Sequence, residues 1–65
     1  MKTLFLLLII FVQDGYPQTE LAWFKNEAAC TTAGQYRLTQ LQTAPLTTGQ
    51  RGSCIRVDYR PGPDI

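Results

Sequence analysis

The apolar residues of this chain are concentrated in one unbroken run near its start. Leu4–Val12 holds nine consecutive hydrophobic residues, five of them β-branched or aromatic. A continuous apolar run of this length that is closed by a turn predicts a strand buried on both faces. The run also fits the hydrophobic region of a secretory leader, with Lys2 as its positive flank.

The residues after this run favour the strand over the leader. A leader needs small residues at its cleavage site, and a cut after Gly15 places Gln13 in one of those positions. A membrane span would need about 20 apolar residues. We therefore expect a strand. A secreted or membrane-anchored small peptide, with residues 1–15 as leader and one disulfide, is the alternative.

A hairpin follows the apolar run. Asp14-Gly15 between two apolar segments is a strong signal for a two-residue hairpin turn. Pro17 lies where the next strand begins, a position at which proline is tolerated. We expect the second strand at Thr19–Phe24, at an edge of the sheet.

A helix is predicted after this hairpin. Asn26 is a favourable N-cap, and Glu27 complements the helix dipole in the first turn. We expect the helix to run from Glu27 to Leu41. A helical projection puts small residues on one face, which suits close packing on a sheet, with leucines at its far end and an arginine at its margin: Cys30, Ala33, Gly34, Arg37, Leu38 and Leu41.

The last third of the chain divides into a loop, a strand and a tail. Gln42–Gly52 is rich in Thr, Gln and Gly and is expected to be a long loop. Ser53–Tyr59 alternates in the manner of a strand. Residues 60–65 contain two prolines and are expected to form a flexible tail, so that residues 1–59 make one small domain.

Together these elements predict an α+β fold with the order ββαβ. The most apolar strand belongs in the centre of a three-stranded sheet, in the order 2-1-3, antiparallel around its centre. One helix covers one face. Both alternate sets of side chains in Leu4–Val12 are apolar, so a second copy, another protein or the long loop is expected to cover the remaining face. Which face the helix covers stays open. The candidate interface is Phe5, Leu7, Ile9, Phe11, Trp23, Ile55 and Val57.

The two cysteines allow one disulfide. A bridge between Cys30 and Cys54 would close a loop of about 25 residues, worth roughly 3 kcal/mol. The alternative is a pair of buried thiols. If Cys54 faces the helix in order to meet Cys30, strict alternation places the apolar residues Ile55 and Val57 on the other face, away from the helix. We therefore expect either a bulge after Cys54 or no bridge.

The composition offers little for catalysis. The chain has no histidine, its net charge is +1, and its carboxylates are scattered. Two cysteines do not supply the four ligands of a structural zinc site. We expect no enzyme activity, cofactor or metal. Arg51, Arg56 and Arg60 form a candidate anion or nucleic-acid patch, for which the alternative is a surface ion pair between Arg56 and Asp58. Nucleic-acid binding is therefore a further, weaker alternative.

Several short motifs together resemble a group of known proteins. An Asp-Gly turn after an apolar strand, the helix start Glu27-Ala28-Ala29-Cys30 and the last strand opening Cys54-Ile55-Arg56-Val57 resemble small uncharacterised proteins of bacteriophages and prophages. The resemblance implies a phage or bacterial origin and no known activity. We expect a non-enzymatic accessory protein in the cytoplasm of a bacterial host. It would act through protein–protein contact as a homodimer.

Overall fold

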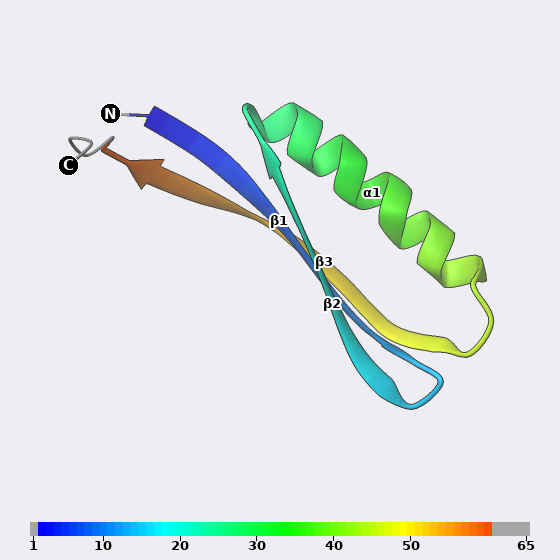
Figure 1. Ribbon diagram of the computed structural model, residues 1–65. Coiled ribbons are helices and arrows are strands. Elements are labelled where there is room, and N and C mark those ends of the chain that lie inside the picture. The colour runs from blue at the N-terminus through cyan, green and yellow to red at the C-terminus, as the bar shows by residue number, and fades with distance from the viewer. Residues whose placement is uncertain (1, 61–65) are drawn as a thin grey trace.

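The computed structural model describes residues 2–60. Its elements are β1 (Lys2–Gln13), β2 (Tyr16–Phe24), α1 (Glu27–Thr43) and β3 (Thr47–Tyr59). The strands form one antiparallel sheet in the order β2-β1-β3, and α1 packs on one face of it (Figure 1). The predicted α+β architecture is confirmed, with the apolar run as its central strand. The expected tail lies almost entirely outside the described residues.

The hairpin turn between β1 and β2 sets the register of the sheet. Asp14 and Gly15 both have positive φ, at 51° and 81°. Positive φ at both central residues is the requirement of a type I′ turn, whose twist matches that of the flanking strands. The turn pairs Gln13 with Tyr16, and the same register brings Leu6 opposite Trp23.

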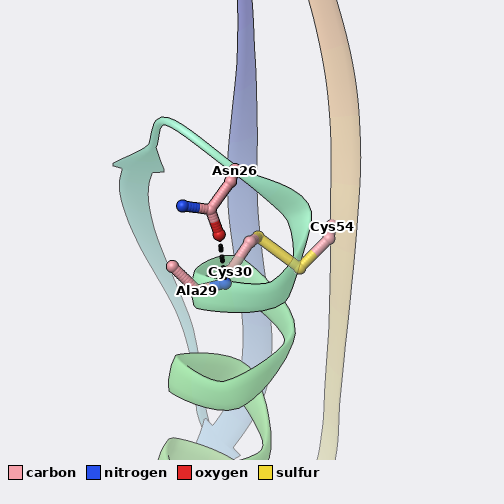
Figure 2. Close-up of a disulfide and its surroundings, with 4 residues drawn as sticks. All are labelled: Asn26, Ala29, Cys30 and Cys54. Atoms are coloured by element: carbon pink, nitrogen blue, oxygen red, sulfur yellow. Dashed lines mark hydrogen bonds between the residues drawn. A yellow bond between two sulfur atoms is a disulfide. The ribbon is translucent and has the colours of Figure 1, made fainter.

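The start of α1 is capped as the sequence predicts. The Asn26 side-chain oxygen accepts a hydrogen bond from the Ala29 N–H at 2.8 Å, as Figure 2 shows. This bond satisfies one of the backbone donors that every helix leaves open at its start. The helix continues through Gly34 without a break and ends two residues after the expected Leu41, at Thr43.

The core lies between α1 and β1. Among the described residues, five hydrophobic side chains are buried: Leu7, Ile9, Phe11, Cys30 and Leu41. A core of this size is small, and small domains commonly need an additional cross-link or a partner to be stable. The described helix is neither long nor apolar enough to cross a membrane.

This arrangement corrects part of the candidate interface. Phe5, Leu7, Ile9 and Phe11 do not lie on an exposed surface, because three of them are core residues and Phe5 packs against that core. The physical reason lies in their neighbours on the outer strands. Ala22 and Cys54 lie opposite Leu7, and Gly52 lies opposite Ile9. These small residues leave room for a helix on that face.

The third strand is longer than predicted, and the expected loop Gln42–Gly52 is wrong. β3 begins at Thr47, and Thr47 and Thr48 pair with the end of β1. An irregularity between Ile10 and Val12 of β1 accommodates this extension. The connection from α1 to β3 is therefore short. Its Leu46 carbonyl accepts a hydrogen bond from the Asp14 N–H at 2.9 Å, which ties it to the hairpin turn.

A disulfide joins α1 to β3. Cys30 lies in the first turn of α1 and Cys54 lies on the helix side of β3, with their Cα atoms 6.1 Å apart (Figure 2). The register is continuous from Arg51 to Tyr59, so the expectation of a bulge or no bridge is wrong. Ile55 and Val57 alternate to the other face without conflict, because that face is also apolar.

Candidate interaction surface

The face of the sheet opposite α1 is apolar from Leu4 to Val12 of β1. Alternation places the even-numbered residues of β1 on this side, which we call the open face (Figure 1). Its central row consists of Leu4, Leu6, Leu8, Ile10 and Val12. Ile10 and Val12 are exposed in the free chain. One helix cannot cover both faces of a sheet, so no element within residues 2–60 covers this row.

The outer strands widen the open face. Trp23 on β2 and Ile55 on β3 lie on either side of Leu6, and Leu21 lies beside Leu8. Leu21 and Trp23 are 63% and 56% exposed. Val57 and Tyr59 extend the surface along β3, opposite Leu4 and Lys2. Exposed large apolar residues are common singly, but a continuous patch of them marks an interaction site.

Charged residues lie only at the ends of the open face. Lys2 is at one end of β1, and Arg51 lies opposite Ile10 near the other end. The acidic side chains of the described strands, Glu20 and Asp58, alternate to the helix side. Within residues 2–60 the open face thus has an uncharged centre with two cations at its margins.

The structure divides the predicted interface residues between the two faces. Trp23, Ile55 and Val57 lie on the open face, whereas the four residues from β1 lie under α1. The sequence contained a signal that separates them. A two-residue turn at Asp14-Gly15 pairs Trp23 with Leu6, so Trp23 cannot share a face with Phe5 or Leu7.

The three arginines of the candidate anion patch are not brought together. Arg51 lies on the open face, whereas Arg56 lies opposite Phe5 on the helix side. Arg56 Nε donates to Asp58 Oδ1 at 3.1 Å, which is the ion pair named as the alternative. Arg60 is an exposed residue that follows the end of β3. Two opposite faces cannot form one anion site.

A hydrogen bond from Thr3 also holds Asp58. The Thr3 hydroxyl donates to Asp58 Oδ1 at 2.7 Å. The bonds from Thr3 and then Arg56 lower the pKa of the Asp58 carboxyl. Because Thr3 belongs to β1, these contacts tie the end of β3 to the start of the central strand.

A second ion pair lies on the helix side, and nothing in the sequence pattern indicated it. Arg37 of α1 donates from Nε to Glu20 Oε1 at 2.8 Å and from Nη2 to Glu20 Oε2 at 2.6 Å. The two parallel bonds lower the pKa of Glu20 and raise that of Arg37. Their side chains are 40% and 37% exposed, so solvent weakens the pair. The pair links α1 to β2, the strand that the helix covers least.

The described residues contain no candidate metal site. Within residues 2–60, no three His, Cys, Asp or Glu side chains lie close enough to hold a metal ion. Comparison with models of protein families, with curated proteins and with solved structures found no match.

Proposed function

We propose that this protein acts through protein–protein contact, as a homodimer whose two sheets pack face to face. The observation that carries the proposal is the open face, on which Leu21 and Trp23 flank an apolar row of β1. Exposed aromatic residues on an apolar patch are typical anchors of protein interfaces. No catalytic step is part of the proposal.

The size of the open face is sufficient for a small dimer. Strands rise about 3.3 Å per residue and lie about 4.8 Å apart, so three strands along the 12 residues of β1 present roughly 500 Å². Two such faces together bury about 1,000 Å², which is near the lower bound for a specific interface. The protruding side chains of Leu21 and Trp23 increase the buried area beyond that of a flat face.

A second copy also suits the chemistry of the open face. Two sheets that pack face to face lie about 10 Å apart and interdigitate apolar side chains. A twofold axis brings the same patch of both copies together, so each apolar centre meets an apolar centre. Lys2 and Arg51 lie at the margins, where water can still solvate them.

The biological setting is also part of the proposal. The resemblance to phage and prophage proteins supports an accessory role in a bacterial host. The disulfide, however, supports an oxidising compartment in place of the cytoplasm that we expected from the sequence, because cytosolic thiols are kept reduced. A chain cut after Gly15 could not form this sheet, since β2 and β3 both pair with β1.

The oligomeric state tests the proposal. Sedimentation equilibrium of the oxidised protein between about 5 and 500 μM is expected to show a reversible monomer–dimer equilibrium, the range in which interfaces of minimal size associate. A protein that remains monomeric over the whole range would overturn the homodimer.

A matched pair of lysine variants tests which face is used. Trp23→Lys introduces a charge on the open face and is expected to abolish the dimer. Tyr36→Lys introduces the same charge at an exposed aromatic residue of α1, which is 68% accessible. This variant is expected to leave the dimer intact. Circular dichroism of both variants checks that each one is folded. Equal loss of the dimer in both would move the interface away from the open face.

A further inference from the structure

The two sulfur atoms of the disulfide differ in their surroundings. Cys30 is fully buried, with 0% of its surface exposed, and belongs to the hydrophobic core. Cys54 is only partly buried and packs against that core from β3. Figure 2 shows the bridge running from the first turn of α1 outward to β3. A reagent from solution therefore meets the two ends of the bond differently.

A groove between α1 and β3 leads to the Cys54 end. It has a volume of about 170 Å³, and Cys54 lines it together with Thr31, Gly34 and Leu38. Small residues keep it open. A Cβ at Gly52, which also lines it, would lie 3.3 Å from Leu38 Cδ1. The groove lies on the helix side of the sheet, away from the open face.

We propose that Cys54 is a thiol-exchange site for a small thiol that carries no other charged group and reacts as its thiolate. The thiolate sulfur attacks Cys54 Sγ and forms a mixed disulfide with it. The Cys30–Cys54 bond breaks, and its electron pair leaves with Cys30 as a thiolate. One disulfide is consumed and one is formed, so the step needs no further oxidant or reductant.

Attack on Cys54 makes Cys30 the leaving group. Cys30 is fully buried in the hydrophobic core, where apolar surroundings disfavour the charge of its thiolate. The first turn of α1, in which Cys30 lies, offsets part of this cost because negative charge is stabilised near a helix N-terminus. Access through the groove therefore directs the attack to Cys54.

The exchange would loosen one end of the helix. The bridge ties the first turn of α1 to β3, whereas Leu41 packs in the core near the other end of the helix. A protein carrying the mixed disulfide keeps its sheet but loses this tether. Exchange at Cys54 therefore changes how firmly the first turn of α1 packs on the sheet. The open-face dimer uses the other side of the sheet and does not depend on this exchange.

Trapping the first exchange product tests this inference. The folded protein is treated briefly with 2-mercaptoethanol, and the exchange is quenched with acid. Free thiols are then alkylated, and fragment mass spectrometry shows which cysteine carries each adduct. We expect the mercaptoethanol on Cys54 and the alkyl group on Cys30, in at least about tenfold excess over the opposite arrangement. Equal adducts on both cysteines, an excess on Cys30, or no adduct without denaturant would overturn the proposal.

Two helix variants test the route of entry. Thr31→Trp fills the groove and is expected to slow formation of the mixed disulfide several-fold. Thr32→Trp adds the same side chain at the next exposed position of α1, outside the groove, and is expected to leave the rate unchanged. Equal rates in the two variants would show that attack follows general unfolding and would overturn the groove as the route.

Discussion

Gly34 of α1 lies directly against Leu7 of β1. A Cβ atom on residue 34 would lie only 3.0 Å from Leu7 Cδ1, closer than such atoms normally approach. Glycine within a helix costs about 1 kcal/mol relative to alanine. A glycine at such a position therefore indicates either close packing or a break in the helix. The continuous helix shows that close packing is the reason.

Enlarging residue 34 should therefore destabilise the protein. Gly34→Leu forces a large side chain against a buried Leu7 and is expected to lower the free energy of unfolding by about 1–3 kcal/mol. Gly34→Ala gains helix propensity while displacing one methyl group, and should stay within about 1 kcal/mol of the wild type. Urea denaturation measures both. Thr32→Leu, at an exposed helix position, is the control, and equal stability of Gly34→Leu and this control would contradict the packing.

Leu46 adopts a backbone conformation that a leucine rarely occupies. Its φ is +60°, although it carries a Cβ and is 71% exposed. A non-glycine residue in the left-handed region costs about 1–2 kcal/mol. Leu46→Gly removes that cost, whereas Leu46→Ala keeps the Cβ and the strain. Glycine also costs conformational entropy on folding, which offsets part of this gain. We therefore expect the free energy of unfolding of the glycine variant to be higher than that of the alanine variant by roughly 1 kcal/mol, as measured by thermal unfolding. A less stable glycine variant would contradict this conformation.

The Glu20–Arg37 pair makes a pH-dependent contribution to stability. The pKa of Glu20 is lowered from 4.5, mainly by the hydrogen bonds from Arg37. A lowered pKa stabilises the folded state above the unfolded-state pKa, and this stabilisation is lost as the pH falls through the folded-state value. The stability advantage of the wild type over Glu20→Gln should therefore be largest above about pH 5 and shrink toward pH 3. Urea denaturation at several pH values measures it, and an advantage that grows with acidity would contradict the pair.

The disulfide should supply a large part of the stability. Its 24-residue separation predicts a loss of roughly 3 kcal/mol when the bridge is removed. We expect Cys30→Ala combined with Cys54→Ala to unfold at a clearly lower urea concentration than the oxidised protein. The wild type in excess reductant should behave similarly. Unchanged stability in both would mean that the core alone holds α1 in place.

The sequence was most informative where local chemistry decides the structure. Asp14-Gly15 and Asn26 mark a turn and a cap that depend on neighbouring residues alone, and both are found where expected. The long apolar run of β1 identified the central strand. These signals are sufficient for the order of elements and for the order of strands.

Features that depend on distant parts of the chain were missed. Thr47–Gly52 has the composition of a loop, yet it is a strand because β1 offers it an unpaired edge. The choice between the two apolar faces depends on Ala22, Gly52 and Cys54, which come together only in the sheet. The Arg37–Glu20 pair likewise joins residues 17 positions apart. Composition alone contains none of these pairings.

The most direct test of the open-face dimer is an isotope-filtered NOE measurement. Labelled and unlabelled copies are mixed, so that only contacts between different copies are observed. We expect such contacts between the Trp23 indole and the methyl groups of Leu6, Leu8 or Ile55 of the other copy. Contacts between copies that involve Tyr36 of α1 and leave the open face free, or no contacts at millimolar concentration, would contradict the account.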